Sequence, residues 1–147
     1  MIDKKHIGRT FAPTSAEVEK GRLRFFAKAI GETNPIYTDE AEARRAGYAS
    51  LPVPPTFFFS LEMEKPDPFG WMKDVGMDLA RLLHGEQTFT YHVPACAGDT
   101  LTFDSRIDDI YDKKNGALTF LVKTVKVTNQ RGEHVADLRS SIVHRNT

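Results

Sequence analysis

The spacing of apolar and polar positions changes along the chain, from a helical period near the start to a strand period from residue 85 onward. In the first segment Thr14 and Glu17 have the spacing of a capping box, and Gly31 supplies a helix stop. We therefore expect an amphipathic helix that begins at Thr14 and ends before Gly31. The apolar residues that recur on its one face are Val18, Phe25, Phe26, Ala29 and Ile30.

A second, shorter helix is predicted directly after a loop of residues 31–37. Thr38 is its candidate N-cap, its first turn is acidic, and its last turn carries Arg44 and Arg45. This order of charges is favourable in the field of a helix dipole, and Gly47 supplies the stop. The loop is therefore expected to be held between two helices.

Prolines separate the second helix from a third, buried one. Pro52, Pro54 and Pro55 exclude a helix from their own segment. The apolar run 56–64 follows them, with Thr56 as a candidate cap. Residues 66–83 contain further prolines and glycines, which predict a covering loop with short helical turns.

From Gly85 onward the pattern is that of strands. Phe89 and Tyr91 alternate with polar residues, which is typical of a strand with one buried face. The turns 114–116 and 129–132 contain the Asn and Gly residues that tight hairpins need. The fold class is therefore α+β, with the helix at 56–64 covering the apolar face of an antiparallel meander. Its further strands are expected at 99–103, 105–111, 117–128 and 133–144.

Length and composition favour one domain that spans residues 1–147. Of the 147 residues 40% are hydrophobic, which is enough for one core. Twenty basic and twenty acidic residues cancel, and no basic run is long enough to neutralise a phosphate backbone. Neither nucleic acid nor a membrane is therefore an expected partner. The start of the chain has no apolar signal core and no apolar run is long enough to span a bilayer, so a soluble, cytoplasmic protein is expected.

Few residues outside the loop 31–37 suggest chemistry. Cys96 is the single cysteine and lies among small apolar residues, which favours a packed residue over a reactive thiol. The five histidines show no short spacing of metal ligands and no accompanying Cys or Asp cluster, so no metal site is predicted. His84 stands at a strand start. The sequence leaves two alternatives for it, namely contact with the loop 31–37 or a structural role.

The loop and its neighbours resemble one enzyme family. Residues 31–36, which read Gly-x-x-Asn-Pro-Ile, together with Ala43 resemble the signature of the MaoC-like (R)-specific enoyl-CoA hydratases and 3-hydroxyacyl-thioester dehydratases. The segment 47–57 is similar to the N-terminal, FAS1-like dehydratase branch, and 83–101 is similar to the family's first long strand and turn. The resemblance covers nearly the whole chain. It implies a hotdog fold, in which an antiparallel sheet wraps around a central helix.

The resemblance also implies how the loop would act. Catalytic members carry an Asp and a His there, which hold the water that adds to the double bond of an enoyl thioester. In this chain the Asp position holds Glu32 and the His position holds Tyr37, which are the candidate catalytic residues. At the position of Pro55, catalytic members have a glycine whose N–H faces the thioester oxygen, a donor that proline lacks. The candidate substrate-binding residues are Asn34, Pro55, Thr56 and Phe57.

Three functions are compatible with these substitutions. The chain is either the substrate-binding half of a hydratase/dehydratase, paired with a homologous catalytic subunit, or a self-sufficient hydro-lyase that uses Glu32 with Tyr37 or His84. The third alternative is a hotdog thioesterase, in which a carboxylate activates water. All three act on an acyl-CoA or acyl-carrier thioester, and none requires a bound cofactor. A homodimer or heterodimer is expected, because hotdog domains in general pair through an exposed edge strand.

Overall fold

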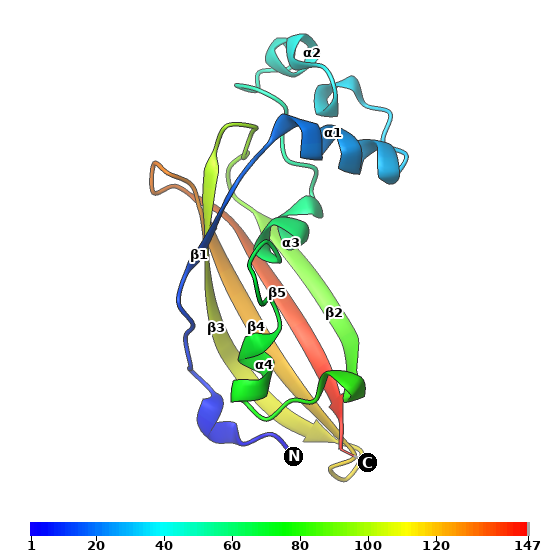
Figure 1. Cartoon of the computed structure of the whole chain (residues 1–147), viewed down its shortest axis with the longest axis vertical. Helices are drawn as coiled ribbons and strands as arrows, with labels where there is room; N and C mark the ends of the chain where they lie inside the picture. Colours follow the sequence, from blue (N-terminus) through cyan, green and yellow to red (C-terminus); the bar gives the residue numbers. More distant parts are fainter. Residues whose placement is uncertain (147) are drawn as a thin grey trace.

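The computed structural model describes residues 1–146 and is built on one five-stranded antiparallel sheet (Figure 1). The strand order across the sheet is β1-β3-β4-β5-β2, so β1 and β2 lie at its two edges. β3, β4 and β5 form the predicted meander, whereas the chain places β2 beyond β5. The strands are β1 (Thr14–Glu17), β2 (Leu82–Tyr91), β3 (Thr100–Lys113), β4 (Leu118–Thr128) and β5 (His134–Arg145).

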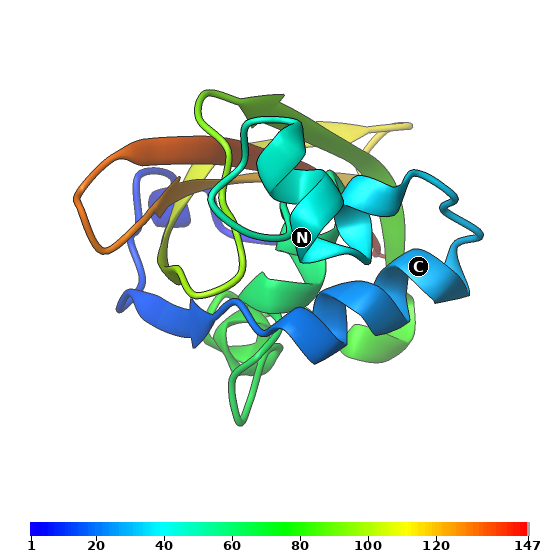
Figure 2. The ribbon, with the colours of Figure 1, turned by 90° about the horizontal axis from the view of Figure 1, so that it is seen from above.

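The helices lie on one side of this sheet and at one of its ends. α3 covers the sheet face, whereas α1 and α2 lie beyond the strand ends, opposite the two chain termini (Figures 1 and 2). This arrangement confirms the expected α+β architecture with a sheet around a central helix. The helices are α1 (Lys20–Ala29), α2 (Glu40–Arg45), α3 (Phe57–Glu62) and α4 (Gly70–Asp74), and the 3-10 turns are η1 (Lys4–His6), η2 (Pro35–Tyr37) and η3 (Leu79–Arg81).

The predicted start of the first helix is wrong. Thr14–Glu17 is the edge strand β1, which pairs with β3, and α1 begins only at Lys20. Ala16 of this strand is buried opposite Leu101. Backbone pairing with the long strand β3 satisfies the N–H and C=O groups of this segment, and this tertiary interaction outweighs the local capping signal.

The other predicted helix boundaries agree with the structure, except for small differences at the caps. Asp39, and not Thr38, caps α2: its carboxylate accepts hydrogen bonds from the N–H groups of Ala41 at 2.8 Å and Glu42 at 3.3 Å. Thr56 precedes α3 as expected, but its side chain makes no capping hydrogen bond. The stop at Gly31 is confirmed by a φ of 71°, a left-handed conformation that glycine adopts without strain.

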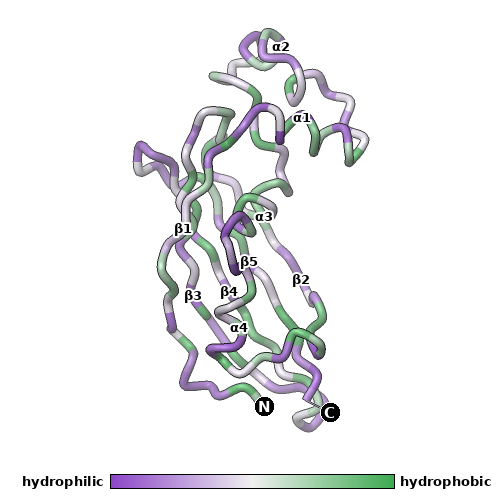
Figure 3. The backbone as a smooth tube through the Cα atoms, viewed as in Figure 1, coloured by the Kyte–Doolittle hydropathy of each residue, from purple (hydrophilic) through white to green (hydrophobic). Residues whose placement is uncertain are grey.

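The core lies between α3 and the middle strands. Phe57, Phe58 and Leu61 on the buried face of α3 belong to the same cluster as Val125 of β4 and Leu138 of β5. Figure 3 shows α3 as a mostly hydrophobic segment over the sheet. Each of these side chains stabilises the fold by about 1.5–3 kcal/mol when it is fully buried. α3 is therefore fixed on the sheet, and its first residues have defined positions.

A second cluster lies under α4, at the end of the sheet that carries the termini. Met72 and Val75 pack there with Ile107 and Ile110 of β3. The predicted strands 99–103 and 105–111 are one continuous strand, β3, with an irregularity between Ile107 and Asp109. Within residues 1–146, no helix has both the length and the apolar character needed to cross a membrane.

Candidate functional site

The loop between α1 and α2 is organised by its own polar side chains. The Asn34 side chain accepts a hydrogen bond from the N–H of Ile36 at 3.2 Å and so caps η2. The Glu32 carboxylate accepts one from the N–H of Asn34 at 2.8 Å. Both side chains are exposed and line none of the hollows described below. Their role in this structure is to hold the turn that presents Tyr37.

Tyr37 lines a cleft between the loop and the start of α3. The cleft has a volume of about 240 Å³ and a largely apolar wall. Small-molecule sites usually enclose about 300–1,000 Å³, so this cleft is small for an acyl thioester. Its lining residues are Tyr37, Tyr48, Pro52, Val53, Pro55, Phe58, Tyr91, His92, Val93, Pro94 and Ala95.

A second hollow lies on the other side of the α3 start. It has a volume of about 390 Å³, and its lining includes Thr56, Phe59, His84 and Phe89. Phe89 stacks with Tyr91 of the first cleft, with ring centroids 6.1 Å apart. The two hollows are therefore neighbours, separated by the Pro55–Thr56 peptide and by two aromatic rings of β2.

Tyr91 joins the edge strand to the start of α3. Its hydroxyl donates a hydrogen bond of 2.7 Å to the carbonyl oxygen of Pro55. Burial raises the pKa of Tyr91, and the neighbouring Tyr37 raises it further. Pro55 has no N–H, so its backbone offers no donor to a thioester oxygen, and its carbonyl oxygen already accepts the Tyr91 hydroxyl.

The electrostatics of Tyr37 favour the protonated phenol. Burial raises the pKa of Tyr37 above its ordinary value of 10.0, and the negative charge of Glu32 raises it further. A phenol in this state donates a hydrogen bond at neutral pH but does not take a proton from water. The side chain is therefore suited to orient a carbonyl or a hydroxyl group.

The structure groups the sequence candidates only in part. Tyr37 and Pro55 share the first cleft, while Thr56 lies in the second hollow. Phe57 is buried against Phe26, with ring centroids 4.8 Å apart. His84 packs edge-on against Phe59 in the second hollow, which Tyr37 does not line.

Three titratable side chains of the first cleft were missed by the sequence reasoning, namely Tyr48, Tyr91 and His92. Tyr91 had a signal, because the strand alternation placed it on the buried face together with Phe89. His92 and Tyr48 had none. Their positions depend on how the segment after β2 and the segment after α2 meet in space.

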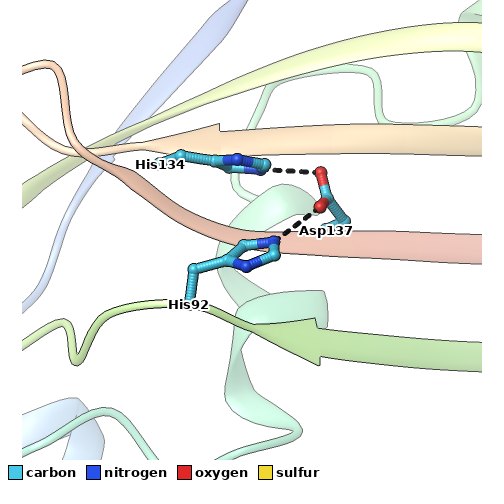
Figure 4. Close-up of side chains that lie close together, drawn as sticks. All are labelled: His92, His134 and Asp137. Carbon is cyan, nitrogen blue, oxygen red and sulfur yellow. Dashed lines mark hydrogen bonds and ion pairs between the residues drawn. The ribbon is translucent and has the colours of Figure 1, made fainter.

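The structure also assembles a group of metal-ligating side chains that the sequence spacing did not indicate. His92, His134 and Asp137 place one ligand atom each within 4.8 Å of one another (Figure 4). The histidines are 42 positions apart in the sequence, which a search for short motifs does not detect. Cys96, as predicted, is a buried residue of the core region.

The edge of the sheet beside both hollows is exposed. β2 pairs only with β5 among the described residues, so its other side presents free backbone groups. Large apolar side chains are exposed on this strand, on α1 and at the C-cap of α1, namely Leu83 (51%), Tyr91 (48%), Phe25 (76%) and Ile30 (55%). Such a combination is typical of a surface that another chain covers.

Comparison with known proteins gives a coherent picture. A family model described as "FAS1-like, dehydratase domain region" matches residues 5–138. A UPF0336 protein from Saccharopolyspora erythraea is 37% identical over 147 residues, which cover 99% of this chain and 93% of the relative.

Two solved structures are similar over nearly the whole chain. One is a chain of the C-terminally truncated HadBC (3R-hydroxyacyl-ACP dehydratase) complex from Mycobacterium tuberculosis, with a TM-score of 0.83, 24% identity, and coverage of 94% of this chain and 96% of that chain. The other is a MaoC-like dehydratase with a TM-score of 0.85 and 25% identity, and the match covers 95% of this chain but 42% of the dehydratase. These similarities confirm the expected hotdog fold.

Proposed function

Because this chain belongs to the FAS1-like dehydratase domain family, we propose that it is the substrate-binding half of an acyl-thioester hydratase/dehydratase. Its partner is a homologous hotdog subunit that carries the catalytic Asp and His. The observation that carries the proposal is the state of Tyr37, which stands at the position of the family's histidine and holds its proton more strongly than an ordinary tyrosine. A general base at this position needs the opposite shift.

The other candidate residues support the same assignment. The Glu32 carboxylate is exposed and accepts the Asn34 N–H, so it is engaged in holding the turn. Pro55 lacks the N–H that the resemblance assigns to polarisation of the thioester carbonyl. Binding surface is retained, since Tyr37, Phe58 and Tyr91 line an apolar cleft. The chain thus keeps the means to hold a thioester without the groups that move protons.

Pairing is supported by the size of the cleft and by its place beside the edge strand. The cleft has a volume of about 240 Å³ and is lined in part by Tyr91 of β2, so a second subunit on β2 would add walls to it. The HadBC neighbour is described as a complex. The MaoC-like dehydratase neighbour has more than twice the length of the matched segment, which leaves room for a second domain of this size.

The test compares the chain alone with the chain and its partner. Hydration of 2-enoyl-CoA thioesters is followed for this chain, for a homologous subunit with the intact Asp and His encoded in the same genome, and for the mixture. We expect turnover from the mixture at a rate well above that of either chain. Within the complex, Tyr37→Phe is expected to raise KM more than it lowers kcat, whereas Asp→Asn in the partner abolishes kcat.

A second candidate is the self-sufficient hydro-lyase. It is favoured by one observation, namely that the charge of Glu32 acts on the phenol of Tyr37 and raises its pKa, so the two candidate residues are electrostatically coupled. Turnover by the purified chain alone that Glu32→Gln removes would establish this function and refute the division of labour. Release of free thiol from a saturated acyl-CoA would instead identify a thioesterase.

A further inference from the structure

Three side chains converge on the face of the sheet opposite α3. His92 directly follows β2, while His134 and Asp137 belong to β5. The Asp137 carboxylate joins the two rings: its Oδ2 lies 2.8 Å from Nε2 of His92, and its Oδ1 lies 2.8 Å from Nε2 of His134 (Figure 4). The two ring centroids are 4.2 Å apart.

The register of the sheet explains this convergence. Asp137 pairs with Thr90, so His92 lies two residues beyond it along the neighbouring strand. Ala136 and Leu138 are buried in the core, and side chains alternate along a strand, so Asp137 projects from the other face. His134 lies next to the irregularity between Val127 and Thr128, which positions its ring over the same face.

We propose that His92, His134 and Asp137 bind one divalent transition-metal ion of the zinc class. Zinc binds imidazole nitrogen at about 2.0–2.1 Å and carboxylate oxygen at about 2.0–2.2 Å, so two ligand atoms of one ion lie at most roughly 4.2 Å apart. The three ligand atoms lie within 4.8 Å of one another, which is close to this limit. Two imidazoles favour zinc, copper or nickel over magnesium or calcium.

The electrostatics and accessibility of the cluster suit a cation. Burial raises the pKa of Asp137, but the hydrogen bonds from His92 and His134 outweigh this effect and leave the pKa below its ordinary value. The carboxylate is thus held as an anion. The side chains are 38%, 40% and 31% exposed, so an ion and its water reach them. Lys126 pairs with Asp137 across the sheet, on β4.

Binding changes the hydrogen bonding of the cluster in a defined way. In the metal-free protein one carboxylate is shared by both Nε2 atoms. To bind the ion, each ring would present the lone pair of Nε2, and the carboxylate would become the third ligand. Three protein ligands leave a coordination position for water. The ion joins the end of the edge strand β2 to β5.

The test is titration of metal-free protein with Zn²⁺ by isothermal calorimetry, together with thermal unfolding with and without the ion. We expect one ion per chain, a dissociation constant far below about 1 mM, and a higher Tm with zinc. His92→Gln, His134→Gln and Asp137→Asn are each expected to weaken binding by at least about tenfold, because changes even to groups around a metal's ligands cost this much.

The matched control is His84→Gln. His84 is an exposed histidine on β2 that packs against Phe59 in the second hollow. It is expected to bind Zn²⁺ as tightly as the unchanged protein. The conservative Asn and Gln variants keep the shape of the cluster, and circular dichroism of each variant verifies its fold. The proposal is overturned if zinc binds only at millimolar concentration, or if the three cluster variants and the control bind it equally well.

Discussion

Glu62 on α3 and Lys123 on β4 form an ion pair beneath the central helix, with Oε1 and Nζ 2.5 Å apart and side chains that are only 3% and 8% exposed. The Lys123 ammonium also lies 5.2 Å from the ring centroid of Trp71. Two charges in such a place are tolerated because each compensates the other. The pair therefore ties α3, whose first residues separate the two hollows, to the middle of the sheet.

Removal of one partner of this ion pair should destabilise the folded protein. Glu62→Leu leaves the Lys123 ammonium buried without its partner, and we expect the free energy of unfolding to fall by about 3–5 kcal/mol. The double variant Glu62→Leu/Lys123→Met removes both charges and should recover most of the loss. Urea denaturation of the two single variants and the double variant measures the coupling. A double variant less stable than either single variant would show that the ion pair is not the source of the effect.

The edge strand β2 depends on a glycine at position 85, where β5 leaves no room for a side chain. A Cβ atom at this position would lie 2.9 Å from the carbonyl oxygen of Ser141 and 3.1 Å from the Val143 side chain. Gly85→Ala is therefore expected to destabilise the protein by about 1–3 kcal/mol, the usual cost of overpacking. Gly21→Ala on α1 is the control, because a Cβ there meets nothing within 4 Å and alanine favours a helix. Equal losses in the two variants, measured by thermal unfolding, would contradict this account.

Two of the phenols that line the first cleft, those of Tyr37 and Tyr91, should ionise at a higher pH than an ordinary tyrosine. Burial and neighbouring groups raise the pKa of both Tyr37 and Tyr91 above 10.0. The folded protein then keeps protons that the unfolded chain releases near pH 10, so the associated stability is complete below that pH and is lost as the pH rises through the folded pKa values. Ultraviolet titration should show two late phenols.

Variants assign these titrations. Tyr37→Phe should remove one late phenol and bring Tyr91 closer to an ordinary pKa, because Tyr37 contributes to its shift. Glu32→Gln should lower the pKa of Tyr37 only in part, since burial is the larger cause. A Tyr37 phenol that ionises below pH 10 would contradict the environment described here.

The exposed edge should govern association. Leu83 is 51% exposed on β2, so Leu83→Lys is expected to weaken pairing with a second hotdog chain while changing the stability of the monomer by no more than about 0.5 kcal/mol. Ile7→Lys is a matched control, because Ile7 is 43% exposed but lies away from β2, near β3. Sedimentation equilibrium measures both. Association unaffected by Leu83→Lys would exclude this edge as the interface.

Local chemistry explains which elements the sequence predicted well. The acidic start and basic end of α2, the stop at Gly31 and the alternation around Phe89 are signals that act within a few residues, and all reappear in the structure. Thr14–Glu17 failed because its local capping signal competes with a strand pairing more than 80 residues away in the chain. Propensity is a weak guide where such pairing is available.

Sequence patterns were enough to predict the α+β class, the loop that carries Glu32 and Tyr37, and the helix that lies on the sheet, because periodicity, caps and turns are properties of neighbouring residues. Three relationships became visible only in the folded chain: Tyr37 and Tyr91 line one cleft, β2 lies at an open edge, and His92 contacts Asp137. These relationships depend on strand order and register. Long-range packing sets both, and no spacing along the chain records them.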